Sequence, residues 1–83
     1  MKVMLRYFAS VREAMGRGLE ERQTGATTLA ALRQELQALG DPYAQALGAG
    51  KAVRMALDQV MADGDAPLRD GCEVAFFPPV TGG

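Results

Sequence analysis

The chain has 83 residues, a length that accommodates one domain with a small hydrophobic core. Hydrophobic residues make up 48% and charged residues 23%, a balance typical of a folded domain and too apolar for intrinsic disorder. Nine basic and ten acidic side chains leave a net charge of −1, which does not favour binding to nucleic acid or to an anionic membrane. No apolar run approaches the roughly 18 residues that span a bilayer, and the N-terminus does not resemble a signal peptide.

The missing residue types restrict the chemistry further. Without histidine and with a single cysteine, Cys72, the chain cannot form a Ser-His-Asp or Cys-His pair, a His-ligated metal site or an internal disulfide. The single cysteine fits a reducing compartment, and we expect a cytoplasmic protein. The carboxylates are scattered along the sequence, as on a solvated surface. We therefore expect no bound cofactor or metal, and no side-chain catalysis by this chain alone.

Alternating side chains predict a first strand over residues 2–8. Ser10 then stands where a helix cap would, and a short helix should begin at Val11 and stop at Gly16. Residues 19–23 form a weak, polar strand candidate of the kind found at a sheet edge. On the first strand, Val3, Leu5 and Tyr7 are assigned to the core face, and Lys2, Met4, Arg6 and Phe8 to the opposite face.

The clearest helix follows, capped by Thr27 or Thr28 and ended by Gly40 in the left-handed conformation. Pro42 prevents this helix from resuming, and a second short helix is expected over residues 43–47. The main helix is amphipathic because its leucines recur every three or four residues and form one apolar stripe. That stripe consists of Leu29, Leu32, Leu36 and Leu39.

The remainder of the chain is predicted to be extended. Residues 53–57 alternate as in a strand, a turn follows at residues 58–59, and the chain returns through residues 60–61. Residues 73–77 form the last strand. The order strand, strand, helix, strand, strand, strand predicts a single α+β domain over residues 1–83. In it, one main amphipathic helix covers one face of a mixed sheet.

Residues 78–83, Pro-Pro-Val-Thr-Gly-Gly, are the unusual part of the sequence. The two prolines favour an extended stalk that cannot pair further into a sheet, and Gly82 and Gly83 carry no side chain. Glycine alone allows a backbone to pass through a narrow channel into a partner's active site without a Cβ clash. The terminal carboxyl group of Gly83 is therefore a candidate reactive group. A frayed chain end is the alternative.

Both ends of the sequence resemble a known family. Residues 70–83, DGCEVAFFPPVTGG, look like the C-terminal signature of the small subunit of molybdopterin synthase, the MoaD family. The first strand with residues 7–13, YFASVRE, and the helix over residues 29–36 are similar to that family as well. Two turn positions depart from it, because Cys72 replaces the usual Asp and Asp58 replaces a common Asn. We interpret Cys72 as a small turn residue, with a redox or sulfur-carrying thiol as the alternative.

The resemblance implies a ubiquitin-like β-grasp fold and a role as sulfur carrier. In that family a MoeB-type enzyme uses ATP to adenylate the terminal glycine, which is then converted to a thiocarboxylate. The tail enters the large, MoaE-type subunit of a heterotetramer and donates sulfur to cyclic pyranopterin monophosphate, forming the molybdopterin dithiolene. This chain would then be the sulfur-donating subunit of a sulfurtransferase and not catalytic alone. The resemblance places Gly82 and Gly83 at the reaction, and Pro78, Pro79, Val80 and Thr81 in contact with the partner.

Strand parity adds a prediction about the partner surface. If Phe76 faces the helix, then Phe77 lies on the opposite face of the sheet, as Phe8 does. The first and last strands of a β-grasp sheet are neighbours, so the two rings should lie close together, with Met61 as a third member. Clustered exposed aromatic residues mark an interface. The alternatives are ordinary scattered surface groups, or coverage of Phe8 by residues 9–18.

Three other functions stay open on the sequence alone. The chain could be a sulfur carrier for thiamin or tRNA thiolation, a ubiquitin-like modifier that conjugates to other proteins, or an interaction domain with an inert tail. The Phe-Phe-Pro-Pro-Val stalk at residues 76–80 favours the pterin pathway among the sulfur carriers.

Overall fold

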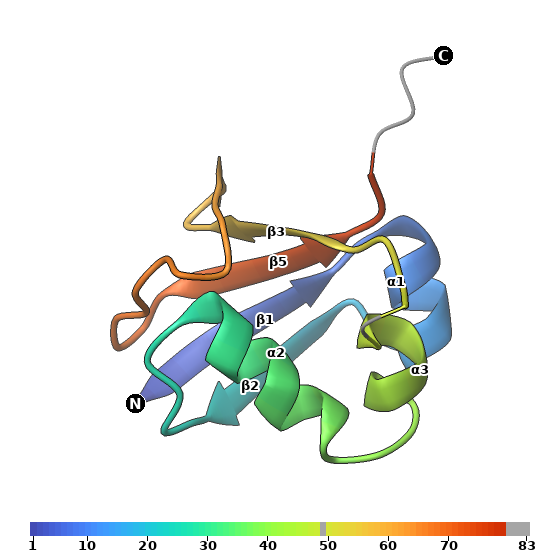
Figure 1. Cartoon of the computed structure of the whole chain (residues 1–83), viewed down its shortest axis with the longest axis horizontal. Helices are drawn as coiled ribbons and strands as arrows, with labels where there is room; N and C mark the ends of the chain where they lie inside the picture. Colours follow the sequence, from blue (N-terminus) through green and yellow to red (C-terminus); the bar gives the residue numbers. More distant parts are fainter. Residues whose placement is uncertain (49, 80–83) are drawn as a thin grey trace.

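A five-stranded mixed sheet with a helix lying across one face forms the framework of the molecule (Figure 1). The computed structural model describes residues 1–48 and 50–79. In chain order the elements are β1 (Lys2–Tyr7), α1 (Ala9–Met15), β2 (Leu19–Gln23), α2 (Leu29–Gln37), α3 (Tyr43–Leu47), β3 (Arg54–Leu57), β4 (Val60–Met61) and β5 (Glu73–Phe77).

The first and last strands lie side by side at the centre of the sheet. The strand order is β2-β1-β5-β3-β4, in which β1 and β5 are parallel and the other neighbouring pairs are antiparallel. Two parallel strands must be joined by a long crossover connection. Here the chain between β1 and β5 forms that connection, and it contains α2. This arrangement is the β-grasp, and it confirms the expected α+β class. The polar strand β2 lies at the sheet edge, also as expected.

The core lies between the inner face of the sheet and the helices. Val3, Leu5 and Tyr7 are at most 1% exposed, so the parity predicted for β1 is confirmed. Phe76 of β5 is fully buried on the same side. Full burial of one such side chain stabilises the fold by about 1.5–3 kcal/mol relative to exposure. The leucines that α2 contributes to this core are Leu29, Leu32 and Leu36, each 0% exposed.

The N-terminus of α2 is satisfied by a side chain and by a distant loop. The Thr28 hydroxyl accepts a hydrogen bond from the Ala31 amide at 3.2 Å, which confirms the predicted cap. The Leu29 amide donates to the Ala66 carbonyl at 3.1 Å, and the Ala30 amide donates to the Gly64 carbonyl at 2.8 Å. These bonds pair helix amides that have no partner within the helix, and they tie α2 to the loop that leads back to β5.

The predicted start of the first helix was wrong. Phe8 is the N-cap and makes no side-chain cap bond, and Ser10 lies inside α1. The cause is a long-range contact, because the Phe8 amide donates to the Phe76 carbonyl at 3.1 Å and holds the chain against β5 up to that residue. Ala9, with φ of 50°, then turns the chain directly into the helix. The predicted stop is confirmed, since Gly16 adopts φ of 77°.

The predicted apolar stripe of the main helix was too long by one residue. Leu39 is 47% exposed because the regular helix ends at Gln37, so Leu39 leaves the buried face. Gly40 adopts the expected left-handed conformation, with φ of 86°. The short helix α3 has the bounds that were expected for it. Among the described helices, none combines the length and apolar character needed to cross a membrane.

Candidate functional site: the end of the central strand pair

The C-terminal segment leaves the sheet from its most firmly held strand. In β5, Val74 and Phe76 are fully buried, and the strand is paired on both sides, with β1 and with β3. The strand ends at Phe77 because proline has no backbone N–H to continue the ladder. Pro78 and Pro79 are half-buried where the chain leaves the sheet (Figure 1). The predicted site residues Val80, Thr81, Gly82 and Gly83 lie outside the described residues.

The strand register brings Phe8 and Phe77 to the same end of the sheet. Tyr7 of β1 lies opposite Phe76 of β5 in the parallel pair. Phe8 and Phe77 are the residues that directly follow them in sequence. Phe8 is 43% exposed and Phe77 is half-buried, so residues 9–18 do not bury the Phe8 ring. Their role in binding a partner is still a prediction.

Met61 joins the same face of the sheet from the edge strand. It lies opposite Ala56, which in turn lies opposite Ala75, and Met61 is 57% exposed. The two alanines are buried although they face away from the core, because they are small and lie between larger neighbours. Arg6 follows on β1, opposite Ala75. On the outer face, the small side chains of Ala56 and Ala75 therefore separate the larger side chains of Met61 and Arg6, and Phe77 lies beside them.

Two arginines flank the aromatic residues on this face. The Arg6 guanidinium lies 5.6 Å from the centre of the Phe8 ring, within cation–π range, and 3.7 Å from the Glu73 carboxylate. Arg54 is exposed and lies opposite Phe77 in the β3–β5 ladder. Strand alternation predicts Arg6 on this face without a role, and Arg54 was not among the predicted site residues. The signal for Arg54 is the same alternation, because Arg54 shares a face of β3 with Ala56, which lies opposite Met61.

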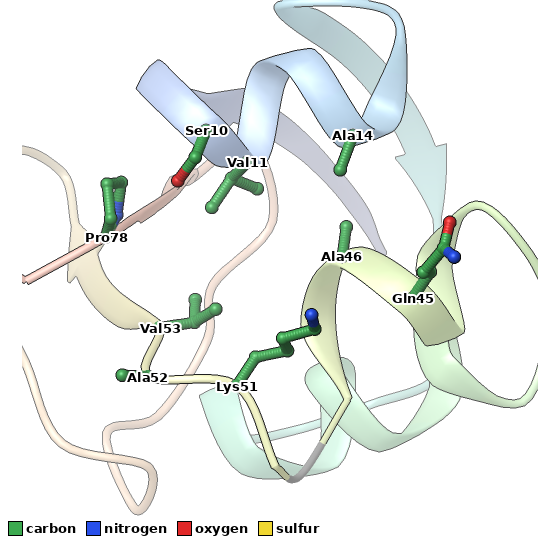
Figure 2. Close-up of a pocket in the computed structure, with 9 residues that line it drawn as sticks. All are labelled: Ser10, Val11, Ala14, Gln45, Ala46, Lys51, Ala52, Val53 and Pro78. Carbon is green, nitrogen blue, oxygen red and sulfur yellow. The ribbon is translucent and has the colours of Figure 1, made fainter.

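A pocket of about 260 Å³ opens next to the start of the tail. It lies between α1, α3 and the segment before β3, and Pro78 closes one end (Figure 2). Val11 and Ala46, 4% and 6% exposed, are its buried residues, and Lys51 alone is charged among the described residues that line it. No local pattern in the sequence predicts this pocket, because segments that are far apart in the sequence form it.

One carboxylate joins three elements near the start of α3. The Tyr7 hydroxyl donates to Glu20 Oε1 at 2.9 Å, and the Tyr43 hydroxyl donates to Glu20 Oε2 at 2.6 Å. Glu20 thereby links β1, β2 and the start of α3. Burial and then the hydrogen bond to Glu20 raise the pKa of Tyr7 well above its ordinary value, and the same causes in the same order raise the pKa of Tyr43. Both tyrosines are therefore neutral donors at neutral pH.

Arg33 of α2 holds the other wall of the pocket. Its Nε donates to the Leu47 carbonyl at 2.8 Å, and its Nη2 donates to the carbonyls of Gly48 and Lys51 at 3.1 and 3.2 Å. These bonds satisfy carbonyl groups at the end of α3 and beyond it, where the helix offers no partner. One guanidinium thus fixes the end of α3 and the backbone that carries Lys51.

The described residues offer little conventional catalytic chemistry. Cys72 is 5% exposed and packs in the hydrophobic core, and its backbone carbonyl accepts from the Met4 amide at 2.9 Å. The environment fits the interpretation of Cys72 as a small structural residue. Within residues 1–48 and 50–79, no group of three or more Cys, Asp or Glu side chains is placed to hold a metal ion.

Comparisons with known proteins agree with this geometry. The chain is 48% identical over 77 residues to the "Molybdopterin synthase sulfur carrier subunit" of Escherichia coli, covering 93% of this chain and 94% of that protein. The small archaeal modifier protein SAMP1 from Haloferax volcanii has the same fold, with a TM-score of 0.77 at 20% identity and full coverage of both chains.

A solved complex of subunits 1 and 2 of molybdopterin-converting factor from Helicobacter pylori contains a chain that is 27% identical to this one. The match has a TM-score of 0.69 and covers the whole of both chains. The ThiS family model matches residues 5–83 of this chain. The chain therefore belongs to the ThiS family of ubiquitin-like β-grasp proteins, and its curated relatives are sulfur carrier subunits of molybdopterin synthase.

Proposed function

We propose that this protein is the sulfur carrier subunit of a cytoplasmic molybdopterin synthase and that the carboxyl group of Gly83 carries the sulfur. The observation that carries the proposal is the similarity to the curated carrier subunits over 93% of this chain, together with a tail that starts from the buried central strand β5. A firmly held origin lets the last residues reach into a partner while the domain stays folded. In this proposal the chain supplies a recharged co-substrate, and catalysis belongs to its partners.

The chemistry follows from the properties of a carboxylate. A carboxylate is a poor electrophile, so it first attacks the α-phosphate of ATP on a MoeB-type enzyme and releases pyrophosphate. A persulfide sulfur then displaces AMP from the acyl-adenylate and forms an acyl disulfide. A thiol attacks the outer sulfur of that disulfide, which releases the thiocarboxylate and leaves a new disulfide between the two thiols. The thiocarboxylate is a soft nucleophile that is charged at neutral pH. It transfers its sulfur to cyclic pyranopterin monophosphate in the large subunit, where two carriers must act for each dithiolene.

The outer face of the sheet is the proposed contact with the large subunit. Phe8 and Met61 are exposed, and Phe77 lies at the start of the tail, so one partner can cover all three while it binds Pro78 to Thr81. The Helicobacter pylori complex of subunits 1 and 2 supports a large-subunit partner. We propose a heterotetramer of two small and two large subunits.

The interface is tested by charge substitution with a matched control. Met61→Asp and Phe77→Asp should each weaken binding to the large subunit at least tenfold, because a buried unpaired charge is costly at an interface. Val60→Asp is the control, since Val60 is 66% exposed on the adjacent position of the same strand and points to the other face. Equal binding by all three variants would contradict the proposed interface.

The role of the tail is tested by changing its length. Deletion of Gly83, or addition of a few permanent residues after it, should abolish cofactor assembly with the adenylating enzyme and the large subunit. Full activity of the extended variant would contradict the proposal.

The alternative acceptors are separated by direct competition. The thiocarboxylate form is offered in parallel to the large synthase subunit with its pterin, to a thiazole synthase and to a tRNA thiolase. We expect sulfur transfer to the pterin only. A ladder of higher-mass conjugates on a blot of whole cells would instead support the protein-modifier alternative, for which SAMP1 provides a likeness of fold alone.

A further inference from the structure

The pocket beside Pro78 offers a second contact surface that is separate from the outer face of the sheet. We infer that it receives an apolar side chain of the large synthase subunit, and that a carboxylate next to that side chain pairs with Lys51. The inference rests on the proposed function, because it assigns the occupant to the protein that receives the tail.

The size and lining of the pocket suit a side chain. Its volume of about 260 Å³ lies below the roughly 300–1,000 Å³ of pockets that hold small-molecule ligands. The lining is mostly aliphatic, with Val11 and Ala46 buried and Val53 half-buried. The aliphatic lining groups that still contact water are Ala14, Ala52, Val53 and Pro78, and covering them with an apolar side chain favours association.

The charge of the pocket specifies the neighbour of that side chain. Among the lining residues that the structure describes, Lys51 alone is charged and none carries a carboxylate. Within the described part of the chain, the Lys51 ammonium has no ion-pair partner, whereas the Lys2 ammonium lies 2.9 Å from Glu21. Figure 2 shows the Lys51 side chain extending from its loop toward Ala46. A partner carboxylate at this rim would pair with an ammonium that the fold leaves available.

The position of the pocket specifies the partner. Pro78 lines it, so a protein that holds the chain as it leaves β5 must approach this wall. Ser10 and Val11 also line the pocket, with Ser10 beside Pro78 in Figure 2, and they follow Phe8 by two and three residues, which places the pocket next to the outer-face contact. A single partner can therefore cover both surfaces, and the hydrogen bonds from Tyr43 to Glu20 and from Arg33 to Leu47 hold the two ends of α3.

Two variants with matched controls test the inference. Lys51→Glu reverses the charge, and its control is Lys2→Glu, because Lys2 begins β1 and lies at the end of the sheet away from Phe77. Ala14→Phe fills the pocket from an exposed helical position, and its control is Ala38→Phe at the exposed C-cap of α2. Circular dichroism checks the fold of each variant. If Ala14→Phe does not fold, the exposed Lys51→Glu variant decides the outcome alone.

The readout is the dissociation constant for the large subunit, measured by calorimetry at low and high salt. We expect Lys51→Glu and Ala14→Phe to bind about tenfold more weakly than their controls, and Lys51→Glu to lose part of the salt dependence. Binding by both pocket variants at the level of their controls would overturn the inference and leave the proposed function intact. Failure of the unaltered protein to bind the large subunit, or to form a thiocarboxylate, would overturn the proposed function and this inference with it.

Discussion

The rings of Tyr7 and Phe76 are stacked, with their centres 6.0 Å apart and their planes 19° apart. Both side chains are at most 1% exposed, and they lie opposite each other in the parallel pair β1–β5. Phe8 and Phe77, the residues that directly follow them in sequence, belong to the proposed interface. The stack therefore joins the core of the domain directly to the surface from which the tail leaves.

Removing one ring of this stack should destabilise the domain severely. We expect Phe76→Ala to lower the free energy of unfolding by about 3–5 kcal/mol, because it removes buried surface and leaves a cavity. The total free energy of unfolding of a small domain is about 5–15 kcal/mol, so the variant should be close to unfolding. Phe77→Ala is the control, and since Phe77 is only half-buried its cost should be much smaller. Urea denaturation compares them, and equal losses would contradict this account of the core.

The Glu20 cluster predicts a loss of stability at alkaline pH. The pKa of Tyr7 is raised above its ordinary value of 10.0, first by burial and then by the hydrogen bond to Glu20. The folded state therefore keeps a proton that the unfolded state loses, and this contribution to stability is present below about pH 10 and falls as the pH rises above it. The slope for one such group is at most about 1.4 kcal/mol per pH unit.

Tyr7→Phe provides the check on that pH dependence. The variant has no phenol to titrate at this position, so its urea midpoint should fall less between pH 9.5 and pH 11 than that of the unaltered protein. A slope that is unchanged by the substitution would show that other groups cause the alkaline loss.

Arg33 should stabilise the α3 end and the backbone at Lys51. Its guanidinium donates to three carbonyls, and Arg33→Met keeps the aliphatic stem while removing every donor. We expect Arg33→Met to lower the free energy of unfolding by about 1–3 kcal/mol. Hydrogen exchange at the amides of Lys51 and Val53 should become faster. Gln34→Met, at the neighbouring exposed position of the same helix, is the control. Slow exchange in Arg33→Met would contradict the assignment.

The β3–β4 turn offers a stabilising substitution. Asp58 and Gln59 both have positive φ, 49° and 69°, as a two-residue type I′ turn requires. Glycine reaches this conformation without strain, so Gln59→Gly should raise the free energy of unfolding by about 0.5–1 kcal/mol. Asp58 is left unchanged because its Oδ1 accepts from the Glu73 amide at 3.0 Å. The same change in a helix, Gln34→Gly, should cost about 1 kcal/mol, and a loss of stability at both positions would contradict the turn assignment.

Much of the fold follows from local patterns in the sequence. The alternation of Val3, Leu5 and Tyr7 predicted the buried face of β1, and the strand over residues 73–77 and the helix over residues 43–47 have the bounds that were expected. These predictions succeeded because burial periodicity and the flanking glycines and prolines act over a few neighbouring residues.

The parts that could not be predicted depend on contacts between distant segments. Helix α1 begins at Ala9, before the predicted position, because the Phe8 amide is hydrogen-bonded to the Phe76 carbonyl. No local sequence pattern near Ser10 indicates this long-range bond. The pocket beside Pro78 depends on how α1 and α3 pack together, and Arg33 and Glu20 hold its surroundings through long-range hydrogen bonds. A resemblance at the two ends of the chain identified the tail, whereas only the three-dimensional arrangement brings Lys51 and Pro78 to the same pocket.

The measurement that tests the central claim most directly is the intact mass of the protein after incubation with ATP, a MoeB-type enzyme and a sulfur source. We expect one oxygen-for-sulfur exchange, confined by fragmentation to the peptide that ends at Gly83, and no exchange when ATP is omitted. An unchanged mass with a competent enzyme, or sulfur found on Cys72 instead, would contradict the proposal that the Gly83 carboxyl group is the sulfur carrier.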